Sequence, residues 1–250
     1  VAPQRWRRFV PRLSGKFAHR KTWADAELTA ATRLTQTQAL PIVAPTVPKP
    51  RRAMSDSDDH YPPRMIAMLE AVWGEGFLSP GGTQEVARVI GDHSLSGQTV
   101  LDIGCGAGGI AVALAQQHRA GYVCGIDVED PVLTHARALV AGHGLDGRIG
   151  LIKVAPGPLP FPPAIFDVVF SKDSIIHIPD KHALMREVFR VLKPGGRFLA
   201  SDWLIGTEGA PSPAMAAYIA AEGLDFGMAT PARYHDAMTQ AGFIDVSTRS

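Results

Sequence analysis

A cluster of glycines between two apolar runs constrains the fold of this chain more than any other feature. The apolar run Thr99–Ile103 leads directly into Gly104–Gly109, and a second apolar run follows over Ile110–Ala115. Glycine lets a backbone turn tightly and approach a bound ligand without a side chain in the way. The pattern therefore predicts a strand, a tight turn that faces a ligand, and a helix.

An acidic residue stands just before this turn. Asp102 lies two positions ahead of Gly104, where a carboxylate would repel a pyrophosphate, so the turn favours a cationic ligand. S-adenosylmethionine is such a ligand, since it carries a sulfonium charge, an amino acid tail and a ribose. Asp127 follows the next predicted strand at the distance at which an acidic side chain binds two ribose hydroxyls.

Strands and helices alternate along the main part of the chain. Strands are expected at 99–103, 122–126, 149–154, 166–170 and 197–202, and helices at 109–118, 131–141 and 181–192. This alternation predicts an α/β fold with a doubly wound, mostly parallel sheet and helices on both faces. Because ligands bind at the carboxyl ends of such strands, the glycine turn, Asp127, Ser171–His177 and Asp202 should surround one pocket.

Charge divides the chain into unlike parts. Eleven of its 25 Lys and Arg residues lie within residues 1–53, against two of its 24 Asp and Glu residues. We expect this segment to be a disordered tail. It fits an organelle transit peptide, a nucleic-acid arm or an artefact of start-site choice, in which case Met54 is the true beginning. Residues 54–97 are expected to form a helical cap, and residues 98–250 the ligand-binding domain.

Three motifs together resemble the class I S-adenosylmethionine-dependent methyltransferases, which have a Rossmann-like fold. They are Leu101–Gly106, Gly125–Asp127 and Leu192–Gly196. The resemblance implies S-adenosyl-L-methionine as the cofactor. It is expected to be bound by Leu78, Ser79, Asp102, Gly104, Cys105, Gly106, Asp127, Val128 and Lys172. In this family an antiparallel strand closes the sheet, and no such strand follows Ser250, so we expect a C-terminally truncated domain without its last strand.

A narrower resemblance points to the phosphoethanolamine N-methyltransferases. The segments Gly74–Gly82 and Phe170–Ile178 are similar to that group. The resemblance implies that Tyr61 and His177 close the active site over the substrate and handle the amine proton, with Asp173 beside them. If residues 173–177 form a helical turn, Asp173 and His177 face each other, and the carboxylate orients the imidazole.

Departures from that group bear on the acceptor. Trp203 stands where the group has a phosphate-binding tyrosine, and 222–226 has no cation, which argues against a phosphorylated substrate. Ala155 replaces the acidic residue that reads the adenine amino group. Backbone and apolar contacts are therefore expected to hold the adenine.

The leading hypothesis is an N-methyltransferase that acts on a small amine such as sarcosine, dimethylglycine or ethanolamine. An alternative is C- or O-methylation of a small quinone-like or phenolic acceptor. Gly104, Gly106 and Gly109 also fit the G-x-G-x-x-G pattern of an NAD(P)-dependent oxidoreductase. A further alternative is a methyltransferase-like protein that binds a partner without catalysis.

Several absences complete the analysis. No cluster has metal-ligand spacing, no apolar run is long enough to span a membrane, and no nucleic-acid partner is expected. Cys105 and Cys124 are expected to be buried thiols, which is compatible with a cytoplasmic location. His135 and His182 are expected to face solvent.

Overall fold

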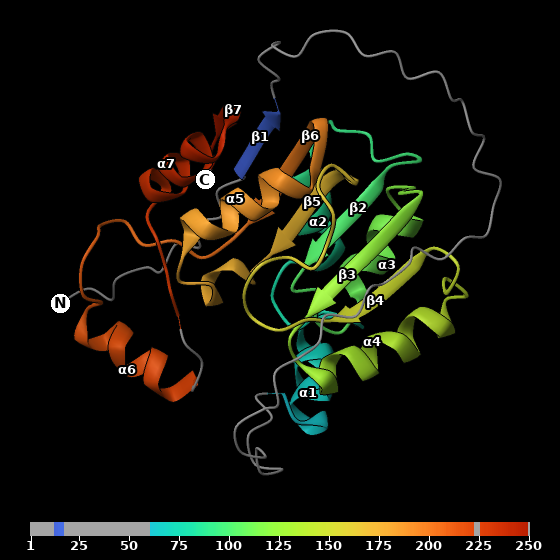
Figure 1. Cartoon of the computed structure of the whole chain (residues 1–250). Coiled ribbons are helices and arrows are strands. Elements are labelled where there is room, and N and C mark those ends of the chain that lie inside the picture. The colour runs from blue at the N-terminus through green and yellow to red at the C-terminus, as the bar shows by residue number, and fades with distance from the viewer. Residues whose placement is uncertain (1–12, 18–60, 223–225, 250) are drawn as a thin grey trace, which may run out of the picture. The chain divides into compact units, whose positions relative to one another are not determined.

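The computed structural model describes residues 13–17, 61–222 and 226–249 (Figure 1). Its elements are, in chain order, β1 (Leu13–Phe17), α1 (Pro63–Trp73), α2 (Gly82–Ile90), β2 (Thr99–Ile103), α3 (Gly109–Gln116), β3 (Tyr122–Asp127), α4 (Asp130–Gly142), β4 (Ile149–Lys153), β5 (Phe166–Lys172), the 3₁₀ helix η1 (Ile175–His177), α5 (Lys181–Val191), β6 (Leu192–Ser201), α6 (Pro213–Glu222), α7 (Pro231–Ala241) and β7 (Phe243–Ser247). No helix of the described residues is both long and apolar enough to cross a membrane.

One sheet organises the described chain, in the strand order β4-β3-β2-β5-β6-β1-β7. The first five strands of this order are parallel to one another. The chain leaves β2 toward β3 and later returns to β5 on the other side of β2, so the strand order reverses between β2 and β5. A ligand site is expected at the carboxyl ends of these two strands, where the glycine turn begins.

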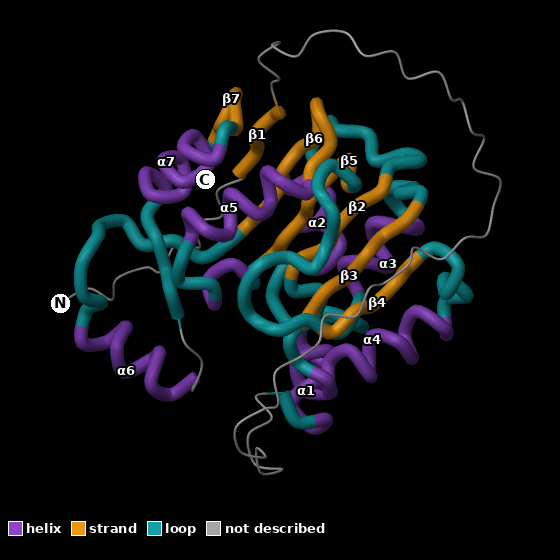
Figure 2. The backbone as a smooth tube through the Cα atoms, viewed as in Figure 1, coloured by secondary structure: helices purple, strands orange, loops and turns teal. Residues whose placement is uncertain are grey.

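Two apolar cores cover the two faces of the sheet. Helices α2, α3 and α4 pack on one face, where Val86, Leu114 and Val140 are buried with residues of the strands. Helices α5 and α7 pack on the other, where Met185 and Met238 are buried. Figure 2 shows the sheet between these two helical layers. The predicted doubly wound α/β fold is confirmed.

Local sequence signals explain where several elements begin and end. Asp180 caps α5, since its carboxylate accepts the N–H of Ala183 at 2.9 Å. The helix ends at Val191, and β6 begins at once with Leu192. The helix thus ends just ahead of the expected stop, and Lys193–Gly196 lies inside β6 rather than before a strand that starts at residue 197. The pairing of β6 with β5 shifts register there, and Gly195 adopts a φ of +80° that glycine tolerates best.

Strand β1 departs from the sequence-based expectation. Residues 1–53 were predicted to be disordered, yet Leu13–Phe17 forms an antiparallel strand between β6 and β7. The expected gap in the sheet is therefore filled by β1, because its backbone pairs Leu13 with Ala200 and Phe17 with Phe243. The rest of the segment 1–53 lies outside the described residues.

The two helices ahead of the main domain pack differently. Helix α2 contributes Val86, Val89 and Ile90 to the core shared with α3 and α4. Helix α1 places Ile66 against Ala107 and Val132, beside the glycine turn. The cap expected at 54–97 is thus packed directly on the ligand-binding domain over its described part, and a boundary at residue 97 remains a prediction.

Candidate active site

The glycine turn joins β2 to α3 through backbone conformations that favour glycine. Gly104, Gly106 and Gly108 have φ values of +72°, +51° and +94°. A Cβ on Gly104 would lie 2.2 Å from the Oγ of Ser174, so no larger residue fits there. Ser174 Oγ donates a hydrogen bond to the carbonyl of Gly104 at 3.0 Å, which ties the end of β5 to the turn.

Asp127, at the end of β3, holds the turn from the other side. One carboxylate oxygen accepts the N–H of Gly106 at 2.9 Å, and the other accepts the N–H of Glu129 at 3.0 Å. Burial raises the pKa of Asp127, and these two backbone donors oppose the rise. Because each carboxylate oxygen accepts more than one hydrogen bond, Asp127 can still receive two hydroxyl groups of a ligand.

Asp102 lies behind the turn and is fully buried. Neither of its carboxylate oxygens has a hydrogen-bond partner. Burial, followed by the negative charge of Asp127, raises the pKa of Asp102 to about 8, and Lys172 opposes that rise. The carboxyl group is thus held in an environment that disfavours its charge.

A cavity of about 700 Å³ opens at the carboxyl ends of the strands, within the size range of small-molecule sites. The sequence-predicted residues that line it are Tyr61, Leu78, Ser79, Gly104, Cys105, Gly106, Asp127, Val128, Lys172, Asp173 and His177. Asp102 is not part of the lining, so any influence it has on a ligand passes through the turn.

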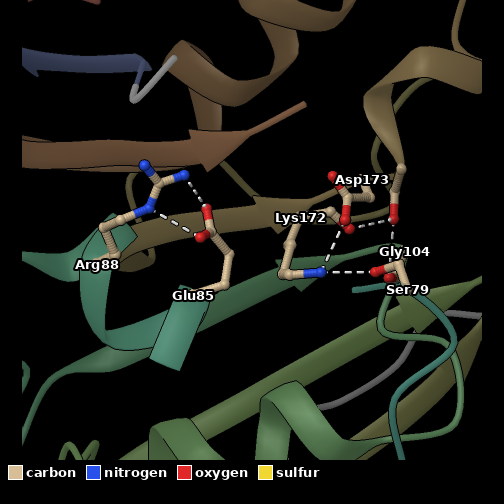
Figure 3. Close-up of polar contacts among 7 residues, drawn as sticks. Ser79, Glu85, Arg88, Gly104, Lys172 and Asp173 are labelled. Carbon is tan, nitrogen blue, oxygen red and sulfur yellow. Dashed lines mark hydrogen bonds and ion pairs between the residues drawn. The ribbon is translucent and has the colours of Figure 1, made fainter. Parts of the chain in front are cut away.

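Figure 3 shows a polar cluster of Ser79, Lys172 and Asp173, three residues that line the cavity. The ammonium of Lys172 donates to Ser79 Oγ at 2.6 Å and to an Asp173 carboxylate oxygen at 2.7 Å. Lys172 is only 2% exposed. The cluster therefore joins the end of β5 to the loop that follows α1.

Residues 173–177 do not form the helical turn that was considered from the sequence. Asp173 has a left-handed φ of +55°, and the 3₁₀ helix η1 begins only at Ile175. The helical arrangement expected to bring Asp173 and His177 face to face is therefore absent, and the Asp173 carboxylate pairs with Lys172. Asp173 and His177 nevertheless line the same cavity.

Aromatic rings stand beside His177. The Phe226 ring lies 5.2 Å from the imidazole, centroid to centroid, and the Tyr218 ring lies 6.3 Å beyond Phe226 in a stacked arrangement. Within the stretch 222–226, which was expected to lack a cation, residues 223–225 lie outside the described part of the chain. Trp203, which follows β6, is 40% exposed.

The loop after α1 is fastened at Gly76. A Glu70 carboxylate oxygen accepts the Gly76 N–H at 2.6 Å and lies 2.9 Å from His135 Nε2 on α4. The Gly76 carbonyl accepts the N–H of Gly109, the first residue of α3, at 2.9 Å. The His135 side chain is 40% exposed, as expected of a solvated residue, and its imidazole also helps to hold the loop that carries Leu78 and Ser79.

Sequence reasoning missed Ser174, Glu70 and Lys181 as members of this architecture. Glu70 and Lys181 have the charge and helical position of ordinary surface residues. Only the tertiary structure shows that Lys181 is fully buried. The adjacency of Ser174 to the predicted His177 segment was the one signal in the sequence that could have singled out the serine.

Comparisons with known proteins agree with this geometry. A family model described as a methyltransferase domain matches residues 101–200. The phosphoethanolamine N-methyltransferase of Triticum aestivum is 36% identical over 182 residues, which cover 72% of this chain and 35% of that protein. The phosphoethanolamine N-methyltransferase 2 of Haemonchus contortus, solved in complex with S-adenosyl-L-methionine, is similar with a TM-score of 0.69 at 29% identity, covering 76% of this chain and 43% of that one.

This chain carries a class I S-adenosylmethionine-dependent methyltransferase domain. The chain spans about a third of the length of the plant relatives that it matches. A relative with different chemistry, the 27-O-demethylrifamycin SV methyltransferase of Amycolatopsis mediterranei, is 32% identical over 159 residues, covering 59% of this chain and 57% of that protein. These relatives are named as methyltransferases, so the comparisons give no support to the alternative of an NAD(P)-dependent oxidoreductase.

The residues present suit S-adenosyl-L-methionine. Asp127 can accept ribose hydroxyls, and Val154, Ala155 and Pro156 line the cavity after β4 with apolar surface that suits an adenine ring. The Asp102 carboxyl group is buried behind the turn, and its raised pKa of about 8 keeps it largely neutral near pH 7. A cationic cofactor at the turn would favour its charged form. Within the described residues, no group of three His, Cys, Asp or Glu side chains is arranged to hold a metal ion.

Proposed function

We propose that this methyltransferase transfers a methyl group to the nitrogen of a small, unphosphorylated amine. One observation carries the proposal: a single cavity is lined at the glycine turn by Asp127 and elsewhere by Tyr61, Asp173 and His177. A site for the cofactor and a set of proton-handling side chains thus share one enclosed space. Sarcosine, dimethylglycine and ethanolamine have the size and charge that suit it.

The proposed chemistry needs alignment and one proton acceptor. When bound, S-adenosyl-L-methionine supplies an electrophilic methyl group on a sulfonium. Asp127 holds the ribose of the cofactor, and Ser79 and Lys172 line the same cavity. A ring nitrogen of His177 takes the proton of the acceptor ammonium, which leaves the nitrogen lone pair free to attack. Tyr61 closes the cavity and excludes water.

Charge in the cavity supports an acceptor without phosphate. Among the described residues that line the cavity, the lysine and arginine side chains are those of Lys172 and Arg186. The ammonium of Lys172 is already bonded to the Asp173 carboxylate at 2.7 Å, so it has little charge to offer a phosphate. Arg186 is exposed on α5. Five carboxylates line the same cavity against these two cations, namely Asp127, Glu129, Asp173, Asp180 and Glu187. This excess of negative charge favours a cationic acceptor.

A second candidate function is methylation of a flat phenolic or quinone-like acceptor. The Phe226 ring beside His177, and the Tyr218 ring stacked on Phe226, favour this function. In that reaction His177 would take the proton of a phenol rather than of an ammonium. The amine is preferred because carboxylates outnumber lysine and arginine side chains in the cavity lining, and this negative charge attracts a cation and repels a phenolate.

Labelled S-adenosylmethionine and a panel of ethanolamine, sarcosine, dimethylglycine, phosphoethanolamine and catechol test the proposal. We expect label in one of the three unphosphorylated amines. Label only in phosphoethanolamine or only in catechol would refute it, and no transfer at all would favour a non-catalytic binding protein.

His177→Ala tests the role of the imidazole. We expect kcat to fall by about 10²-fold, the usual contribution of a general base, while the affinity for S-adenosylhomocysteine stays at the wild-type value. His182→Ala is the matched control, because His182 is a neighbouring histidine on α5 that is not part of the cavity lining. Equal kcat values in the two variants would remove His177 from the mechanism.

A further inference from the structure

A buried lysine lies directly behind the 3₁₀ turn that carries His177. Lys181 is the first residue of α5 and is 0% exposed. Its position is unfavourable twice over. A positive charge opposes the dipole at a helix N-terminus, and burial removes the ammonium from water. Specific partners must therefore compensate the ammonium.

The first partners are the carbonyls on either side of His177. The Lys181 ammonium donates to the carbonyl of Ile175 at 2.6 Å and to the carbonyl of Ile178 at 2.5 Å. Ile175 and Ile178 are also the two ends of the turn, since the N–H of Ile178 donates to the carbonyl of Ile175 at 2.8 Å. One ammonium thus binds the carbonyl groups at both ends of the turn.

The second set of partners lies behind the ammonium. Asp202, at the end of β6, is 1% exposed, and one of its carboxylate oxygens accepts the Tyr234 hydroxyl at 2.5 Å. Its other oxygen has no hydrogen-bond partner. Lys181 lies 5.5 Å from the centre of the Tyr234 ring, and its charge stabilises that of Asp202. Burial lowers the pKa of Lys181, and Asp202 opposes that effect.

We propose that Lys181 is a positioning residue for His177, with Asp202 and Tyr234 holding its ammonium against the turn. The proposal rests on the proposed function, in which His177 accepts the acceptor proton. Other contacts fix the same turn: the N–H of Gly227 donates to the carbonyl of Ile176 at 2.6 Å. Lys181 differs from them because it binds both ends of the turn.

Two variants separate positioning from mere charge balance. Lys181→Met removes the ammonium but leaves Asp202 buried without its cation. The double variant K181M/D202N removes both charges, while the amide oxygen of the new side chain can still accept the Tyr234 hydroxyl. Lys193→Met is the matched control. Lys193 lies at the start of β6 and pairs with Asp167 on β5, in a different part of the sheet.

Hydrogen–deuterium exchange is measured with S-adenosylhomocysteine bound and no acceptor present. We expect the amides of His177 and Ile178 to exchange about 10- to 100-fold faster in K181M/D202N, as loss of a charge-assisted hydrogen bond would produce. K193M should match wild type. We also expect kcat to fall by about tenfold or more in the double variant, with unchanged cofactor affinity and a melting temperature close to wild type.

The outcomes decide between the two roles. If K181M/D202N shows wild-type exchange and wild-type kcat, Lys181 only neutralises Asp202, and the proposal is overturned. Should K181M alone fail to fold, the double variant still gives the answer. Because the exchange experiment needs no acceptor, a failure to methylate any amine would refute the proposed function while leaving the exchange result to decide the role of Lys181.

Discussion

Replacing Asp102 by asparagine should stabilise the protein, and increasingly so as the pH rises. The carboxyl group is fully buried, its two oxygens have no hydrogen-bond partner, and its pKa is raised to about 8 from an ordinary 3.8. Asparagine has nearly the same shape and no charge. The variant therefore removes an ionisation that the folded state disfavours.

The magnitude follows from proton linkage. Between pH 4 and pH 8 the unfolded chain has released the Asp102 proton while the folded protein still binds it, so wild-type stability falls as the pH rises. Each pH unit in this window is worth about 1.4 kcal/mol. From pH 5 to pH 8, the free energy of unfolding of D102N should therefore gain on the order of 4 kcal/mol relative to wild type.

Urea unfolding of both proteins without cofactor, at several pH values from 5 to 8, measures this difference. Asp146→Asn serves as the matched control for loss of a carboxylate, because Asp146 is exposed on the loop after α4. If the stability difference between D102N and wild type is the same at pH 5 and pH 8, the Asp102 carboxyl does not titrate as argued. The reasoning about its burial would then be refuted.

Two further predictions concern the loop that carries Ser79. Glu70→Gln should weaken the hold on Gly76 and raise the KM for S-adenosylmethionine by about tenfold with little change in kcat, since a charge-assisted hydrogen bond is lost; an unchanged KM in steady-state assays would contradict this. Gly109→Ala should destabilise the protein by about 1–3 kcal/mol, because the added Cβ would lie 2.7 Å from the Gly76 carbonyl. Thermal unfolding with and without S-adenosylhomocysteine measures it, and a melting temperature equal to wild type would show that the loop moves aside freely.

The sequence alone determined the strand, turn and helix around the glycines and the alternation that builds the parallel sheet. These features are local: apolar runs set the periods, and Gly104 and Lys193–Gly196 mark where the chain must turn. The sequence also indicated which side chains meet, because the carboxyl ends of parallel strands share one edge. Eight of the eleven predicted site residues that line the cavity lie at or just after the carboxyl ends of β2, β3 and β5 for this reason.

Tertiary structure alone decided which of those side chains touch and how the charges are balanced. Asp173 has a left-handed backbone and pairs with Lys172, and Lys181 is buried beside the Tyr234 ring of α7. Strand β1 enters the sheet through backbone pairing with β6 and β7, far along the chain. No local pattern encodes such contacts, since they depend on residues that meet only after the helices have packed on the sheet.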